Sequence, residues 1–319
     1  MKKALIIGIS GQDGSLLAKF LLEKGYEVYG SSRDASNHSF SNLDNLNIRN
    51  KIHLKSLSTY DFRSTLSIIK NIEPDEIYHL AGQSSVGLSF EQPIETFESI
   101  AISTLNLLET LRFLGSKTKF YSAGSSECFG NTSEKGANEN DRFEPRSPYA
   151  IAKATAFWQI ANYREAYKQF ACTGILFNHE SPYRPARFVT KKIIQTAHKI
   201  SLGLEKKLIL GDISIIRDWG WAEDYVEAMW LMLQQDTAQD FVISTGKVIS
   251  LMEFTDKVFQ CFGLDWKEFV EINESFKRPT DIRFSKGDSS KAKEILGWTP
   301  KHNIDQILNK LIDFERNKI

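Results

Sequence analysis

Tyr149 and Lys153 lie four residues apart in a segment with a helical pattern. On a helix this spacing places both side chains on one face. The ammonium group of Lys153 can then favour the phenolate, so that a tyrosine with an ordinary pKa of about 10 can act as an acid or base near neutral pH. The same spacing occurs in many amphipathic surface helices, so other features of the chain must decide between the two interpretations.

Ser125 and Glu127 form a second reactive group, just after a strand-like run at residues 119–122. The serine hydroxyl could hydrogen-bond an alcohol or carbonyl group that is being oxidised or reduced. Hydride transfer alone needs no further carboxylate, whereas removing a proton beside a ketone and expelling water does. The alternative for Glu127 is a charge that complements a helix N-terminus. Both residues should lie at the carboxyl edge of a parallel sheet, where such sheets bind ligands.

Gly8, Gly11 and Gly14 follow the first strand-like run and precede an amphipathic helical pattern. Glycines at this spacing let the backbone turn tightly and approach a pyrophosphate, whose charge the amide groups at the helix start stabilise. A plain tight turn is the alternative. The strand before and the helix after favour a dinucleotide site.

The end of the second strand-like run indicates which dinucleotide binds. A carboxylate at this place bonds the ribose hydroxyls of NAD, whereas an arginine accommodates the extra phosphate of NADP. Arg33 comes first and Asp34 follows it. This order favours NADP and leaves NAD open; the alternative for Arg33 is a solvated loop charge.

Alternating strand-like and helical patterns over the first 180 residues predict an α/β fold with a doubly wound parallel sheet of the Rossmann type. Beyond Asn178 the strand-like pieces are isolated and helical patterns dominate. We expect an NADP-binding domain over residues 1–178 and a smaller α/β substrate-binding region over residues 179–319, interleaved with the first. Six strands are expected at 4–7, 27–29, 52–54, 76–80, 119–122 and 171–176, with isolated pieces at 208–210, 241–243 and 269–272.

The overall composition excludes several classes of protein. The 40 Lys and Arg residues balance 40 Asp and Glu residues, which leaves no cationic surplus for nucleic acid. No apolar run approaches the roughly 18 to 20 residues of a membrane span, and the first run breaks at Gly8, too early for a signal peptide. Three separated cysteines and six scattered histidines predict neither a disulfide framework nor a metal site. We therefore expect a cytoplasmic protein with no nucleic-acid or membrane partner.

Over nearly its whole length the chain resembles the GDP-mannose 4,6-dehydratase family, whose members are extended short-chain dehydrogenases/reductases. The resemblance rests on long matches: GQDGS at 11–15, PRSPYA at 145–150, GILFNHESP at 174–182 and RDWG at 217–220. It implies a lyase that removes water from GDP-mannose, or from a closely related GDP-sugar, to give a 4-keto-6-deoxy sugar. NADP would be regenerated within each turnover.

The resemblance also implies roles for individual residues. Tyr149, helped by Ser125 and Lys153, would take the proton of the sugar's 4-hydroxyl, and Glu127 would remove the proton at carbon 5 and help the 6-hydroxyl leave. For Arg217 the alternative is a structural ion pair with Asp218. The expected cofactor contacts are Gly8, Ser10, Gly11, Gln12, Asp13, Gly14, Arg33, Leu80, Ala81, Gln83, Tyr149 and Lys153, and the expected substrate contacts are Ser84, Ser85, Asn178, Arg184, Arg217 and Arg278.

The chain also departs from the family pattern, and two other functions stay open. Ser125 stands where the family has threonine, and Asp34 stands where it has a second arginine. The loop at 183–190 differs as well, which leaves a mannose-like heptose open as the sugar. A reductase or epimerase of the same fold would have less use for Glu127, and a non-catalytic cofactor-sensing protein is the other alternative. A homodimer or homotetramer is expected, because relatives pair through helices near 93–114 and 148–168.

Overall fold

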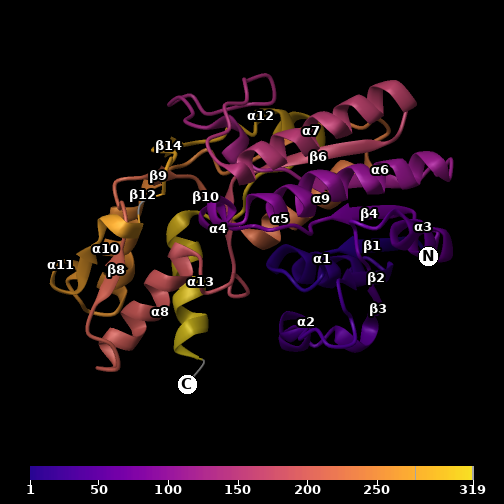
Figure 1. Ribbon diagram of the computed structural model, residues 1–319. Helices are drawn as coiled ribbons and strands as arrows, with labels where there is room; N and C mark the ends of the chain where they lie inside the picture. The colour runs from indigo at the N-terminus through magenta and orange to yellow at the C-terminus, as the bar shows by residue number, and fades with distance from the viewer. Residues whose placement is uncertain (277, 318–319) are drawn as a thin grey trace.

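A seven-stranded parallel sheet forms the centre of the computed structural model, which describes residues 1–276 and 278–317 (Figure 1). The strand order is β11-β6-β5-β4-β1-β2-β3, and every neighbouring pair is parallel. The predicted doubly wound fold is therefore confirmed. The strands are β1 (Lys3–Ile7), β2 (Glu27–Ser32), β3 (His53–Ser56), β4 (Glu76–His79), β5 (Lys119–Ala123), β6 (Ala171–Leu176) and β11 (Phe241–Ile243).

Helices cover both faces of this sheet because the central strands are apolar on both sides. Ala4 and Ile6 of β1 face α1 (Gln12–Glu23) and α9 (Ala222–Gln234) in one hydrophobic cluster. Leu5 and Ile7 alternate with them and face α3 (Phe62–Ile72), α6 (Ser103–Phe113) and α7 (Pro148–Tyr167) in another. The two-residue side-chain period of a strand thus builds a three-layer domain.

Strand β11 differs from the prediction. Residues 241–243 were expected to be an isolated piece in the second region, but they pair in parallel with β6, Phe241 lying opposite Gly174. A run of three apolar residues does not indicate which strand it will pair with. The pairing partner is decided by packing against residues more than sixty positions away in the chain. The second region therefore completes the sheet of the first.

The helical segment predicted at 93–114 is interrupted. It consists of α5 (Pro93–Phe97), a π-helical turn over Glu98–Ile102 and α6. Such turns often occur at functional sites. Here Ser99 accepts a hydrogen bond from the backbone N–H of Gln83 at 3.1 Å, so the turn contacts the loop that follows β4.

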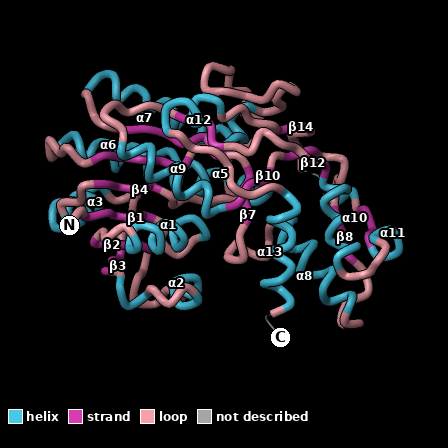
Figure 2. Tube along the Cα trace, turned by 180° about the vertical axis from the view of Figure 1, so that it is seen from behind, coloured by secondary structure: helices cyan, strands magenta, loops and turns pink. Residues whose placement is uncertain are grey.

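The second region lies beside one end of the seven-stranded sheet (Figure 2). Most of the elements not yet described pack there around a hydrophobic cluster of their own. Its main helices are α8 (Val189–Ser201), α10 (Leu251–Cys261) and α13 (Ile304–Arg316), with the short α11 (Trp266–Phe269) beside them. Small sheets pair β7 (Asn178–Glu180) with β10 (Trp219–Trp221), β8 (Leu208–Leu210) with β13 (Val270–Ile272), and β9 (Ile216–Arg217) with β12 (Ile249–Ser250) and β14 (Phe284–Ser285). The other helices are α2 (Ser41–Asn45), α4 (Val86–Glu91) and α12 (Ser290–Leu296). Within the described ranges, no helix combines the length and apolar character that crossing a bilayer requires.

Candidate active site

The glycine-rich turn between β1 and α1 is tightly packed. A Cβ on Gly8, whose φ is +94°, would lie 2.7 Å from the backbone nitrogen of Ala81. A Cβ on Gly14 would collide with the carbonyl oxygen of Gly8. The N-cap of α1 is Gly11, which has no side chain to bond the first N–H groups of the helix. The turn therefore fits a dinucleotide phosphate, which needs backbone approach and free amide groups.

The loop that follows β4 lies against this turn, with Leu80 and Ala81, two of the expected cofactor contacts, next to Gly8. Beyond them, Gln83 donates to the carbonyl oxygen of Ser85 at 2.8 Å and to the hydroxyl of Thr96 at 3.1 Å. The Ser85 hydroxyl caps α4 by accepting from the N–H of Leu88. Gln83 and Ser85 thus hold the loop in shape.

Ser10 lies in the glycine-rich turn after β1, and Arg33 lies in the loop after β2. Arg33 is 79% exposed, and its guanidinium lies 3.6 Å from the carboxylate of Glu95 on α5. An exposed pair of this kind is weak, so the arginine is free to contact a ligand. The carbonyl oxygen of Ser10 accepts a hydrogen bond from the side chain of Asn42 at 3.1 Å.

Of the four predicted catalytic residues, two follow β5 and two lie on α7. Ser147 caps α7 by accepting from the N–H of Ala150, so Tyr149 falls in the first turn of the helix and Lys153 one turn later. Lys153 donates to the carbonyl oxygen of Ala123 at 2.7 Å, which ties the helix to the end of β5. Ser125 follows that strand end and hydrogen-bonds the phenol of Tyr149. The structure thus brings the predicted residues together at the carboxyl edge of the sheet.

The electrostatics of Tyr149 and Lys153 differ from the simple expectation. Burial raises the pKa of Tyr149, and its hydrogen bond with Ser125 opposes that shift. The Lys153 ammonium lies 5.9 Å from the centre of the tyrosine ring and is engaged by Ala123 instead. Burial lowers the pKa of Lys153 from 10.5 to about 8. In the folded protein, then, desolvation outweighs the stabilisation of the phenolate that the spacing suggested.

The lowered pKa of Lys153 predicts a pH-dependent stability. Between about pH 8 and 10.5 the folded protein has released this proton while the unfolded chain still holds it. The free energy of unfolding of the wild type should therefore rise with pH relative to that of Lys153→Met, by up to about 1.4 kcal/mol per pH unit. Urea unfolding of both proteins without nucleotide, from about pH 7 to about pH 9.5, measures the difference. Parallel pH curves for the two proteins would contradict the prediction.

Glu127 lies in a short 3₁₀ helix, Ser126–Phe129, directly after Ser125. Its side chain is partly buried, and within residues 1–276 and 278–317 no hydrogen bond or ion pair to its carboxylate is found. Burial raises its pKa, and the charges of Arg278 and Arg217 partly counter that shift. A desolvated carboxylate without a partner beside a tyrosine–lysine pair is suited to proton transfer.

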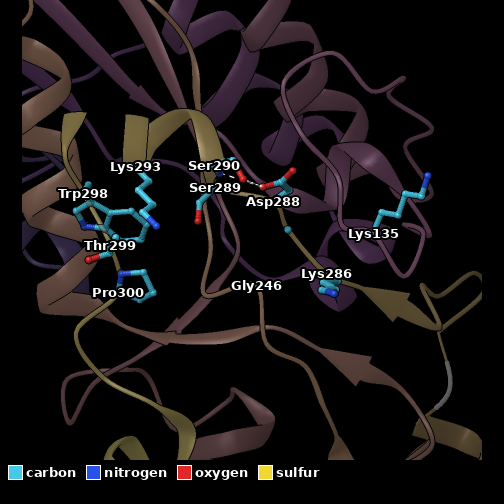
Figure 3. Close-up of a pocket in the computed structure, with 11 residues that line it drawn as sticks. Lys135, Gly246, Lys286, Asp288, Ser289, Ser290, Lys293, Trp298, Thr299 and Pro300 are labelled. Atoms are coloured by element: carbon cyan, nitrogen blue, oxygen red, sulfur yellow. Dashed lines mark hydrogen bonds between the residues drawn. The ribbon is translucent and has the colours of Figure 1, made fainter. Parts of the chain in front are cut away.

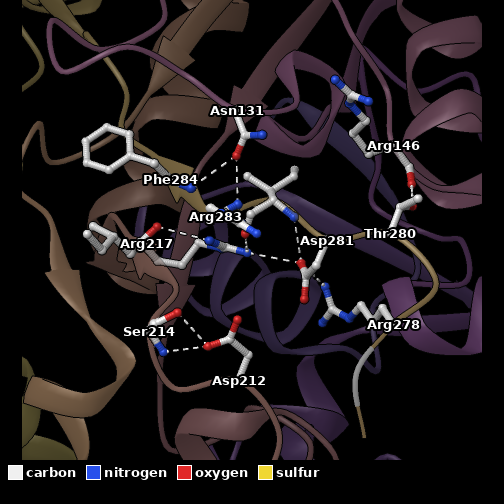
Figure 4. Close-up of polar contacts among 12 residues, drawn as sticks. Asn131, Arg146, Asp212, Ser214, Arg217, Arg278, Thr280, Asp281, Arg283 and Phe284 are labelled. Atoms are coloured by element: carbon white, nitrogen blue, oxygen red, sulfur yellow. Dashed lines mark hydrogen bonds and ion pairs between the residues drawn. The ribbon is translucent and has the colours of Figure 1, made fainter. Parts of the chain in front are cut away.

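Arg217 and Arg278, far apart in the sequence, converge on one carboxylate (Figure 4). Each donates to Oδ1 of Asp281 at 3.3 Å, and Arg217 also donates to the carbonyl oxygen of Ile282 at 2.6 Å. The sequence pointed to both arginines but not to Asp281 as their common partner. The alternative partner of Arg217, Asp218, instead accepts hydrogen bonds from Thr245 and Gly246.

The remaining expected substrate contacts are placed by β7 and the loop after it. Asn178 begins β7, opposite Trp219 of β10. Arg184 lies 3.2 Å from the carboxylate of Glu180 and donates to the carbonyl oxygen of His179 at 2.6 Å. Its guanidinium is thus engaged by groups of the protein itself.

Two connections across the site were missed by sequence reasoning. Arg187 donates to the hydroxyl of Ser84 at 3.1 Å and so joins the loop after β7 to the loop after β4. His179, one of the six scattered histidines to which the sequence assigned no role, bonds Asp13 in the glycine-rich turn. No sequence signal identifies these pairs, because their members are separated by more than a hundred residues.

Two surface pockets lie outside this site. One of about 290 Å³ is bordered by three lysines, Lys135, Lys286 and Lys293, together with the segments around Gly246, Asp288 and Trp298 (Figure 3). The other, of about 920 Å³, lies over α10 and α11. Neither is lined by a predicted site residue. Among the described residues, no group of three His, Cys, Asp or Glu side chains could hold a metal ion.

The parallel sheet, the glycine-rich turn and the tyrosine–lysine pair on α7 define an extended short-chain dehydrogenase/reductase. The structure of UDP-glucose 4-epimerase from Thermotoga maritima, solved with UDP-glucose, is similar with a TM-score of 0.87 and 25% identity over 99% of each chain. That of dTDP-glucose 4,6-dehydratase from Bacillus anthracis, solved in complex with NAD, has a TM-score of 0.86 and 19% identity, covering 100% of this chain and 97% of the other.

The particular family follows from sequence similarity. The pattern of the family described as GDP-mannose 4,6 dehydratase matches residues 5–311. GDP-mannose 4,6 dehydratase 1 of Arabidopsis thaliana is 48% identical over 98% of this chain and 89% of its own. The protein belongs to the GDP-mannose 4,6-dehydratase family, a family of hydro-lyases. The family and enzyme class predicted from the sequence are thereby confirmed.

Proposed function

We propose that this protein is a GDP-mannose 4,6-dehydratase, which removes water from GDP-mannose or a closely related GDP-sugar and forms the 4-keto-6-deoxy sugar. The observation that carries the proposal is Glu127. Its desolvated carboxylate has no partner among the described residues and directly follows Ser125, the residue that bonds Tyr149. A site built for hydride transfer alone would not need this carboxylate.

The proposed mechanism divides proton transfer between two residues. Tyr149, hydrogen-bonded by Ser125 and close to Lys153, accepts the proton of the 4-hydroxyl as that carbon becomes a ketone. The ketone acidifies the proton at carbon 5, which Glu127 removes and passes on to the departing 6-hydroxyl. A nicotinamide cofactor would supply the hydride acceptor for this chemistry and, with a proton returned to carbon 5, would be regenerated within each turnover. The glycine-rich turn and Lys153 would hold it.

The expected substrate contacts suit a nucleoside diphosphate. Arg217 is buried and Arg278 half-exposed, and both donate to Asp281. Because guanidinium groups bond diphosphates through paired, charge-assisted hydrogen bonds, the two arginines can exchange Asp281 for phosphate oxygens. We propose that Asn178, Arg184, Ser84 and Ser85 complete the sugar-nucleotide site, and that residues 1–178 mainly bind the cofactor while 179–319 mainly bind the sugar nucleotide.

The rival functions use fewer of these residues. A reductase or epimerase of the same fold would keep Tyr149 and Lys153 but leave Glu127 without a role. A cofactor-sensing protein would need none of the catalytic side chains. The name of the Arabidopsis relative also favours GDP-mannose as substrate.

The test is to incubate the purified protein with GDP-mannose and several other nucleotide sugars and to measure product mass. We expect loss of one water from GDP-mannose without net consumption of NADPH. Stoichiometric oxidation of NADPH would establish a reductase instead, and absence of water loss from every GDP-sugar would refute the dehydratase proposal.

We propose NADP rather than NAD as the cofactor, on the position of Arg33 directly after β2. Arg33→Ala should then weaken NADP binding about tenfold, the loss of one charge-assisted hydrogen bond, and leave NAD binding nearly unchanged. Fluorescence titration of both cofactors measures the difference. Arg49→Ala, which removes another exposed ion-paired arginine, serves as control. If Arg33→Ala weakened NADP binding and NAD binding equally, the proposal would be contradicted.

The surface of the helices α5, α6 and α7 supports a homodimer or homotetramer. Ile94, Phe113 and Trp158 are 73%, 67% and 63% exposed, which is unusual for large apolar side chains. We propose that a second copy of the chain covers these three side chains. We also propose that the protein is cytoplasmic. Light scattering on the wild type and Trp158→Glu would test the association; a monomeric wild type would contradict it.

A further inference from the structure

A buried histidine–aspartate pair connects the glycine-rich turn to the second region. His179 lies on β7 and Asp13 in the first turn of α1. Nε2 of His179 is 3.0 Å from both carboxylate oxygens of Asp13, and Nδ1 is 2.8 Å from the carbonyl oxygen of Phe177. The side chains are only 10% and 21% exposed. The imidazole therefore contacts an oxygen acceptor at each of its two nitrogens.

Counting protons limits the charge states of this pair. A carbonyl oxygen can only accept a hydrogen bond, and an ionised carboxylate can only accept. A neutral imidazole has a single N–H, so it cannot donate to Phe177 and to an ionised Asp13 together. Either His179 carries both protons, or Asp13 is protonated and donates to the ring.

The surroundings of Asp13 favour its ionised form. Its carboxylate accepts a second hydrogen bond, from the Gln12 side chain, at 2.9 Å. Burial acts to raise the pKa of Asp13, but His179, the Gln12 side chain and the charge of Arg184 together outweigh it, so that the pKa is lowered. With Asp13 ionised, both hydrogen bonds of the ring require an imidazolium.

The other groups around the pair are consistent with a cation at this position. Tyr225 of α9 stacks on the imidazole, with ring centres 4.4 Å apart. Glu180, the next residue after His179, forms an ion pair with Arg184. The charges of His179 and Lys191 also lower the pKa of Glu180, against the effect of its burial. The charge of Asp13 also acts on Lys153, where it opposes the lowering of the lysine pKa by burial. The ionisable groups around the pair are thus one further carboxylate, Glu180, three cations, Arg184, Lys153 and Lys191, and the phenols of Tyr121 and Tyr225.

We propose that His179 is a positioning residue that stays protonated and neutralises the Asp13 carboxylate, so that the glycine-rich turn can bind a dinucleotide diphosphate without repulsion from its own side chain. This inference rests on the proposed nicotinamide cofactor. The physical reason is the position of Asp13. An unneutralised carboxylate in the first turn of α1 would compete with the diphosphate for the same helix N-terminus.

The protonation state can be measured without cofactor. In ¹⁵N-histidine-labelled protein at neutral pH, we expect both ring nitrogens of His179 to carry a proton. Assignment by loss of the signal in His179→Gln identifies the residue. A single N–H on His179 at neutral pH would overturn the inference, whatever the protein binds.

Charge neutralisation is separated from simple packing by a double-mutant cycle on cofactor affinity. His179→Gln leaves Asp13 unneutralised and should weaken NADP binding about tenfold or more. Adding Asp13→Asn removes the carboxylate, so the NADP affinity of the double variant should return to within about threefold of the wild-type affinity. A double variant that binds as weakly as His179→Gln would overturn the inference. If the wild type binds neither NADP nor NAD, the proposed cofactor fails instead, while the ¹⁵N measurement still decides the charge of His179.

Discussion

Replacing Tyr149 with phenylalanine is expected to lower kcat for water loss from GDP-mannose by about 100-fold to 10,000-fold. The phenol is the group that accepts the 4-hydroxyl proton, and Ser125 and Lys153 cannot replace it from their positions beside it. The fold should survive, because the substitution removes one hydroxyl from a well-packed ring. Initial rates of product formation by mass spectrometry measure the effect.

Tyr163→Phe is the matched control for this variant. Tyr163 lies on the same helix, α7, but its phenol bonds Glu109 rather than the site. Its loss should cost some stability and leave kcat nearly unchanged. A Tyr149→Phe protein with kcat within about threefold of the wild type would show that another residue accepts the proton.

Replacing Glu127 with glutamine is expected to lower kcat for water loss by a similar factor, while binding of the nucleotide sugar stays within about threefold of the wild type. Glutamine has the same shape but cannot take the carbon-5 proton. Because burial raises the pKa of Glu127 above its ordinary 4.5 and the base must be ionised, wild-type kcat should fall as the pH decreases through that raised pKa. Glu127→Gln should lack this acidic limb.

Glu139→Gln is the control for loss of a partly buried carboxylate. The pKa of Glu139 is also raised by burial, but its carboxylate accepts from the N–H of Val242 and lies outside the site. We expect this variant to lose stability and keep kcat. If nucleotide-sugar binding weakens in Glu127→Gln as much as turnover does, Glu127 has a structural role and the mechanism is wrong.

Much of the fold was predictable because its signals are local. A strand with apolar residues on both faces, such as residues 4–7, indicates a parallel sheet covered on both sides, and a few consecutive residues are enough to show it. The segment 93–114 was predicted as helical, but its π-helical turn was not, because that turn arises where Ser99 and Ile100 meet the loop around Gly82 and Gln83. The prediction of an isolated strand at 241–243 was wrong because its pairing with β6 also depends on contacts between segments distant in the chain.

The sequence by itself determined the reactive groups of this protein. The spacing of Tyr149 and Lys153, and of Gly8, Gly11 and Gly14, follows from helix and turn geometry, which operate over a few residues. Only the tertiary structure decided how these groups are charged and partnered, because desolvation and ion pairing depend on segments distant in the chain. Burial, rather than helical spacing, sets the direction of the pKa shift of Lys153, and folding alone joins Asp13 to His179.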